Sequence, residues 1–140
     1  MAYMAFKTKI NGVTILIEPE LSGRGVCVFG VNKDNVKDGV SIHYMKTQFG
    51  KLVPVNLQVY NTGICDKSYE FDCITGLFTQ FVDFSNGCKL VAMDKRAINK
   101  HKNDADNYYK QANNLLNNVI NKSTKSMFMR TFLYNELGIR

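Results

Sequence analysis

Asp94–Lys122, with the sequence DKRAINKHKNDADNYYKQANNLLNNVINK, is the stretch that decides the fold of this chain. Its apolar positions recur at alternating steps of three and four residues, the spacing that brings side chains to one face of an α-helix. Asp94 precedes the first turn, where its carboxylate can accept hydrogen bonds from unpaired helical amides. We therefore predict one long helix whose buried stripe comprises Ile98, His101, Ala105, Tyr108, Ala112, Leu115 and Val119.

The other side of the predicted helix is polar, basic and rich in amide side chains. It carries Arg96, Lys100, Asn103, Asn107, Lys110, Asn114, Asn118 and Asn121. A helix with one apolar and one polar face packs the first against a core and leaves the second in water. The rest of the chain should supply that core.

Residues 6–17 predict a β-hairpin with a defined register. Asn11-Gly12 tolerates the positive φ angles of a tight two-residue turn, and alternating residues flank it on both sides. The register places Ile10 opposite Val13, Thr8 opposite Ile15 and Phe6 opposite Ile17. Pro19 should end the second strand, because it has no amide hydrogen for the ladder.

Further turn residues recur between positions 11 and 87 and separate short apolar segments. Short strands joined by short loops indicate antiparallel neighbours. Val53, Val55, Leu57 and Val59 predict one strand at period two, with Pro54 marking an edge or a bulge. Another strand is expected over 69–74, with Tyr69, Phe71 and Cys73 pointing inward.

After the long helix, Met127–Leu137 has a second helical pattern and Gly138 stands where a helix C-terminus is expected. The fold class is therefore α+β: an antiparallel β-meander or small barrel-like sheet of about seven or eight strands, followed by a C-terminal two-helix hairpin. We expect a single domain over residues 1–140, as the length allows. Residues 1–93 would form its sheet part and 94–140 its helical cap.

Charge is distributed unevenly along the chain. Residues 1–88 contain eight Lys/Arg and eight Asp/Glu, so the net charge of +6 comes from residues 89–140, with ten Lys/Arg against four Asp/Glu. Such asymmetry can mark a surface that binds an anion. The predicted nucleic-acid- or anion-binding residues are Lys95, Arg96, Lys100, Lys102 and Lys110. Asp104 and Asp106 lie four residues from three of these lysines, so internal ion pairs are the competing interpretation.

Catalytic and metal-binding patterns are weak. His43 is expected on an outward strand face, without a neighbouring carboxylate or serine in sequence to orient it. The four cysteines lack the spacing of a metal site. In a reducing environment we expect them to be small buried thiols rather than disulfides. We therefore expect a non-enzymatic protein with no catalytic residue, metal or cofactor. No signal-peptide or membrane-spanning pattern is visible, so the expected location is cytoplasmic.

These observations predict a small protein that acts by binding a macromolecular partner. A protein–protein interaction or inhibitor-type module is favoured slightly, and binding of nucleic acid through the basic helix is the alternative. Small Asn- and Lys-rich domains of this kind are common in phage and mobile-element genomes, so a phage-encoded module is one expectation. Homo-oligomers are compatible with the same patterns.

Overall fold

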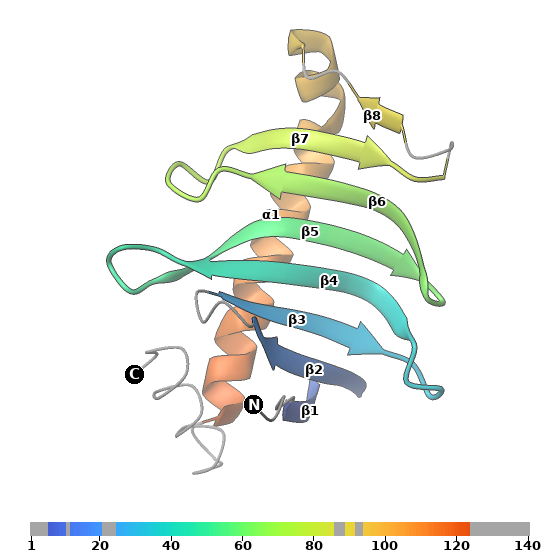
Figure 1. Ribbon diagram of the computed structural model, residues 1–140, viewed down its shortest axis with the longest axis vertical. Helices are drawn as coiled ribbons and strands as arrows, with labels where there is room; N and C mark the ends of the chain where they lie inside the picture. The colour runs from blue at the N-terminus through green and yellow to red at the C-terminus, as the bar shows by residue number, and fades with distance from the viewer. Residues whose placement is uncertain (1–5, 11, 21–24, 86–88, 92–93, 124–140) are drawn as a thin grey trace.

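The computed structural model describes residues 6–10, 12–20, 25–85, 89–91 and 94–123. Eight antiparallel strands form one sheet in which strands that follow each other in sequence are neighbours in space (Figure 1). The chain is thus a β-meander, as the turn spacing predicts. The strands are β1 (Phe6–Ile10), β2 (Val13–Pro19), β3 (Gly25–Val31), β4 (Lys37–Lys46), β5 (Leu52–Asn61), β6 (Ile64–Phe71), β7 (Phe78–Asp83) and β8 (Lys89–Val91). One helix, α1 (Lys95–Ser123), follows the sheet.

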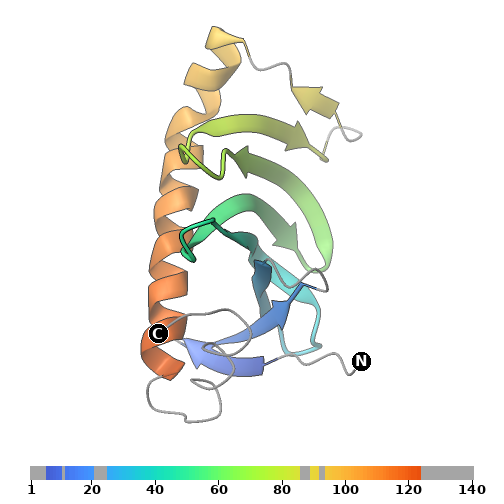
Figure 2. The same cartoon turned by 60° about the vertical axis from the view of Figure 1, so that its left-hand side comes forward.

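The sheet is open, so the expectation of a small barrel is wrong. β1 and β8 are its two edges, and no ladder joins them. The strands curve around α1, which runs across them on the concave side (Figures 1 and 2). Closing a barrel would require its interior to be filled by the strands' own side chains. Here a helix of 29 residues, about 44 Å long, takes that place.

The predicted two-helix hairpin is not supported by the described structure, in which a single helix follows the sheet. The second helix, expected at Met127–Leu137, lies outside the described residues. Within the part of the chain that is described, no helix is both long and apolar enough to cross a lipid bilayer.

The β1–β2 hairpin has the register that its sequence predicts. Phe6 pairs with Ile17, Thr8 with Ile15 and Ile10 with Val13. Gly12 has a φ of 80°, a conformation that glycine adopts without strain. Pro19 is the last residue of β2, so this part of the prediction is confirmed as well.

β5 departs from the alternation that its sequence suggests. His43 pairs with Asn56 and Tyr44 with Pro54, so Val55 is an extra residue on β5 and forms a bulge. The bulge reverses which side chains face the core. Leu52 and Pro54 are buried together with Leu57, whereas Val53 and Val55 are half-buried. Pro54 thus marks a bulge in an interior strand, one of the two positions that its missing amide allows.

β6 ends three residues before the predicted position, and Cys73 is exposed in a turn rather than buried in a strand. The side chain of Asp72 accepts hydrogen bonds from the amides of Ile74 (2.7 Å) and Thr75 (2.9 Å). The Gly76 amide donates to the Asp72 carbonyl at 2.8 Å. Asp72 therefore builds the turn locally, and this turn chemistry overrides the strand pattern.

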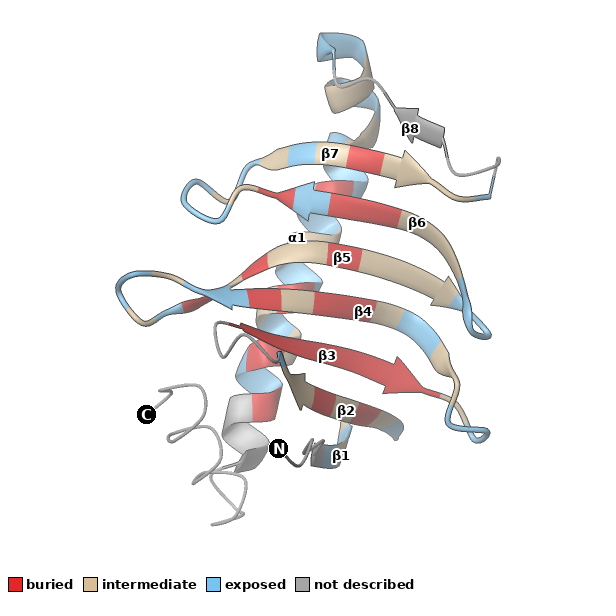
Figure 3. Cartoon of the chain, in the orientation of Figure 1, coloured by how far each residue is buried: buried red, intermediate tan, exposed pale blue. Residues whose placement is uncertain are grey.

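The core lies between the concave face of the sheet and one side of α1. Buried side chains occupy the middle of the strands, and β3 is buried along its whole length (Figure 3). Ala105 and Ala112 are fully buried on α1, where their small size lets the helix approach the sheet closely. The Tyr44 hydroxyl donates to the Ala112 carbonyl at 2.6 Å and fixes α1 on β4. The predicted N-cap is also confirmed, because the Ala97 amide donates to the Asp94 carboxylate at 2.9 Å.

Candidate functional site

The five predicted cationic residues all lie on α1 with exposed side chains. They are Lys95, Arg96, Lys100, Lys102 and Lys110. We call their surface the cationic face of α1. Their exposure follows from the amphipathic pattern, since the buried alanines direct the opposite side of the helix into water.

The internal ion pairs considered from sequence are not formed. None of the five cations lies within 4.0 Å of a carboxylate oxygen of any described residue. Asp104 and Asp106 are exposed on the same helix but do not pair with Lys100, Lys102 or Lys110. The cationic face is therefore not neutralised by ion pairs among the described side chains.

The first turn of α1 carries no acidic residue, and two of the cations, Lys95 and Arg96, lie there. Because the helix macrodipole is positive at this end, each such cation costs about 0.3–1 kcal/mol. The Asp94 carboxylate already accepts from the Ala97 amide at this end. Positive charge available to an anion at the start of α1 therefore comes from Lys95 and Arg96 rather than from free amides.

The aromatic residues of α1 are not available for stacking on a ligand. Tyr108 packs against Tyr69, with ring centroids 5.2 Å apart, and Tyr109 packs against Phe71 at 5.0 Å. His101 stacks on Phe81 at 4.2 Å. These three side chains pack α1 against the sheet. On the cationic face, only the cations and the amide side chains are therefore available to contact a partner.

A second exposed surface lies at the tips of two hairpins. Phe49, in the β4–β5 loop, is 87% exposed, while Ile74 and Leu77, in the β6–β7 loop, are 90% and 66% exposed. Both loops lie at the same end of the sheet, the left in Figure 1. We call these three residues the apolar tips. Pro54 in β5 and Phe81 in β7 are buried, so neither side chain offers an interaction surface.

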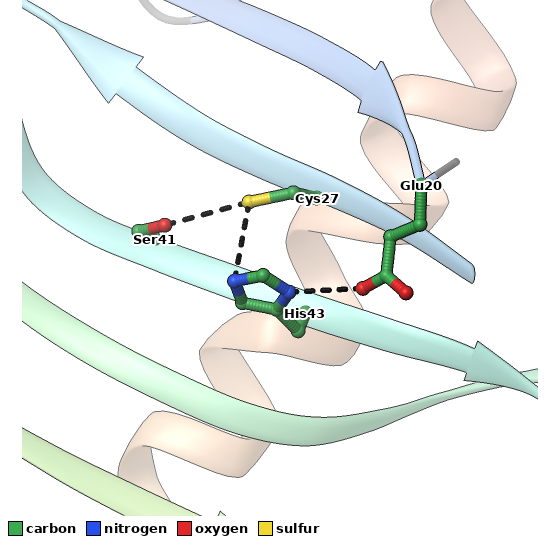
Figure 4. Close-up of polar contacts among 4 residues, drawn as sticks. All are labelled: Glu20, Cys27, Ser41 and His43. Carbon is green, nitrogen blue, oxygen red and sulfur yellow. Dashed lines mark hydrogen bonds and ion pairs between the residues drawn. The ribbon is translucent and has the colours of Figure 1, made fainter. Parts of the chain in front are cut away.

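A third cluster was missed by sequence reasoning. On the convex face of the sheet, His43 lies between Glu20 and Cys27 (Figure 4). Its Nδ1 is 3.0 Å from the Glu20 carboxylate and its Nε2 is 3.7 Å from the Cys27 sulfur. The Ser41 hydroxyl is 3.6 Å from the same sulfur. His43 does face outward as predicted, but it contacts a carboxylate, that of Glu20, which lies 23 residues away in sequence.

These neighbours change the protonation of His43. Its pKa is raised to about 9, chiefly by the hydrogen bond to Cys27 and further by the hydrogen bond to Glu20, which together outweigh the opposing effect of burial. The imidazole is therefore charged at neutral pH. A correct prediction of the β3–β4 register would have indicated part of this cluster, because Cys27 and His43 are direct partners across these two strands.

Metal binding has little geometric support in the described part of the chain. No group of three or more His, Cys, Asp or Glu side chains there is placed to hold a metal ion. In the cluster itself, both ring nitrogens of His43 already face protein partners.

A scan against protein-family models and searches of curated proteins and of solved structures gave no match. The function is therefore inferred from the cationic face of α1, the apolar tips and the cluster around His43.

Proposed function

We propose that this protein is a non-enzymatic binding protein and that it binds nucleic acid through the cationic face of α1. One observation carries the proposal: five cations share an exposed face and none is paired with a carboxylate of a described residue. Lysine and arginine on an open surface bind phosphates and release counterions from the nucleic acid. The geometry favours this partner over the protein partner that the sequence alone slightly favoured.

The dimensions of the cationic face suit a polyanion better than a single small anion. Lys95 and Lys110 are fifteen residues apart on one helix, a distance of about 22 Å along its axis. The sheet packs against only one side of α1 (Figure 2). A nucleic acid laid along the other side would meet several cations at once.

The mode of binding follows from which side chains are available. Cations and exposed amides such as Asn103 and Asn114 can contact phosphates, whereas Tyr108 and Tyr109 are packed in the helix–sheet interface. Contacts to phosphates position a protein but do not read bases. We therefore expect binding with little sequence preference.

A salt titration of the full-length protein with a fluorescent 20-base-pair duplex tests this proposal. Four or five phosphate contacts predict that log K falls against log salt with a slope of about −4, since each contact contributes roughly −0.9. Fluorescence anisotropy between low and moderate salt measures this slope. No binding at low salt, or binding with a slope near zero, would refute the proposal.

A second candidate function, binding of a protein partner, is favoured by the apolar tips. Exposed apolar side chains are common singly, but two neighbouring loops that each present a large one are a more specific feature. The β6–β7 tip is held in place by the Asp72 turn, and the pKa of this carboxyl is lowered by the hydrogen bonds from Thr75 and Ile74. Such a preorganised loop loses little freedom on binding.

Serine substitutions separate this candidate from nucleic-acid binding. Ile74→Ser combined with Phe49→Ser should abolish co-purification of a protein partner that resists nuclease treatment, because the apolar contact area is lost. The control is Ile64→Ser, which removes a side chain that is 69% exposed at the opposite end of the sheet. A partner that is retained equally by the two variants would contradict a role for the apolar tips.

A further inference from the structure

The cluster on the convex face is not used by either binding surface. Cys27 lies in β3, and its partner across the ladder is His43 in β4. Ser41 precedes His43 by two residues and so points to the same side of β4. Cys27 is 7% exposed and Ser41 is 1% exposed, so both residues are largely buried on the convex face.

Hydrogen-bond chemistry indicates which groups donate. An ionised carboxylate only accepts, so Nδ1 of His43 donates to Glu20. The other nitrogen, Nε2, faces the Cys27 sulfur, and the Ser41 hydroxyl faces the same sulfur from another direction. Either partner can be the donor in these two contacts, so the sulfur can give its proton to Nε2 of His43 or accept a hydrogen bond from it and from Ser41.

The charged groups around the sulfur have opposing effects. The imidazolium of His43 favours the thiolate, and Glu20 favours the imidazolium. Glu18 is the partner of Cys27 across β2 and β3, and its carboxylate disfavours a second negative charge nearby. On β5 the partner of His43 is Asn56, which is neutral. The imidazolium is hydrogen-bonded to the sulfur directly, so we expect its effect to exceed that of Glu18.

We propose that Cys27, which contacts His43 and Ser41, is the residue at which small hydroperoxides oxidise this protein. Thiolates, not thiols, attack peroxides, and a neighbouring imidazolium is a common cause of a reactive cysteine. The low exposure of Cys27 restricts the reagent to a small one such as hydrogen peroxide.

The reaction balances with the groups in the cluster. The Cys27 thiolate attacks one oxygen of hydrogen peroxide, so that an S–O bond forms and the O–O bond breaks. The departing hydroxide takes the Nε2 proton of His43 and leaves as water. Sulfur is oxidised by two electrons to the sulfenic acid, the peroxide is reduced, and His43 becomes neutral. An external thiol would be needed to restore the cysteine.

The test treats the reduced full-length protein with hydrogen peroxide at pH 7. At timed points, denaturant and dimedone, which traps sulfenic acids, are added together, so that dimedone reaches every cysteine equally. Peptide mass spectrometry follows all four cysteines in one sample. The thiolate is the reactive form and His43 can hold the thiol proton, so Cys27 should react about tenfold faster than exposed Cys73, which has no such partner among the described residues. His43→Gln should remove most of this advantage and leave the Cys73 rate unchanged.

A second variant keeps the proposal testable if His43→Gln protein does not fold. Glu20→Gln changes an exposed side chain, keeps a hydrogen-bond acceptor for His43 and removes the negative charge. It should slow the labelling of Cys27 by about two- to fivefold, because the imidazolium is less favoured. Circular dichroism shows whether each variant is folded. The proposal is overturned if Cys73 is labelled faster than Cys27, or if folded His43→Gln protein labels Cys27 at the wild-type rate.

Discussion

Replacing Lys95, Arg96, Lys100 and Lys102 with glutamate is expected to lower the affinity for a DNA duplex by about two orders of magnitude or more at low salt. The electrostatic term supplies essentially all of a sequence-independent affinity, and this variant removes four of the five cations of the cationic face. Introduced carboxylates would also repel the phosphates. Fluorescence anisotropy measures the change.

This variant should remain folded. Lys95 and Arg96 lie in the first turn of α1, where an acidic side chain interacts favourably with the macrodipole by about 0.3–1 kcal/mol. All four positions are exposed and none has an ion pair with a described residue, so no ion pair within the described part of the chain is lost. A loss of binding could therefore not be attributed to unfolding.

The matched control reverses four exposed lysines on the sheet and its loops: Lys7, Lys33, Lys46 and Lys51. Each reversal lowers the net charge by two, so both variants change from +6 to −2. The control should keep most of its affinity, since the cationic face is intact. Equal losses in the two variants would mean that net charge alone drives binding and would contradict a defined surface on α1.

Tyr69→Ala is expected to have the largest effect on stability, a loss of about 4 kcal/mol in the free energy of unfolding. Tyr69 is 1% exposed, and its ring packs against Phe81, Phe78 and Tyr108 with centroids 5.0, 5.8 and 5.2 Å apart. The substitution leaves a cavity where α1 meets β6 and β7. Denaturation in urea, followed by circular dichroism, measures the difference.

Phe49→Ala is the control for this prediction, because it also truncates an aromatic side chain, but one that is 87% exposed. It should change the unfolding free energy by no more than about 0.5 kcal/mol. If Tyr69→Ala cost less than about 1 kcal/mol, α1 would not be packed on the sheet through this aromatic cluster.

Local patterns predicted much of the fold because they act over a few residues. The register of β1 and β2 follows from Asn11-Gly12, and the start of α1 follows from Asp94, whose side chain caps the first turn. The face of α1 that meets the sheet follows from helical periodicity, and its burial at Ala105 and Ala112 confirms it. The five cations of the cationic face were therefore correctly predicted to be exposed.

Features that depend on neighbouring strands could not be predicted in the same way. The bulge at Val55 is a property of the β4–β5 pair, and its effect on Leu52 and Pro54 is invisible in β5 alone. The openness of the sheet depends on where α1 packs. The cluster around His43 depends on register and on Glu20, which lies 23 residues away and beyond the end of β2. Tertiary pairing, rather than propensity, decides each of these.

Lysine acetylation with and without DNA tests the central claim most directly, because it follows the four lysines of the cationic face one by one in a protein without substitutions. The full-length chain is acetylated briefly at low salt, and peptide mass spectrometry compares Lys95, Lys100, Lys102 and Lys110 with the exposed lysines at positions 33, 46 and 51. Protection by DNA of the four α1 lysines, with the other three modified as before, is the result we predict. Uniform protection, or protection of the sheet lysines alone, would contradict a binding surface on α1.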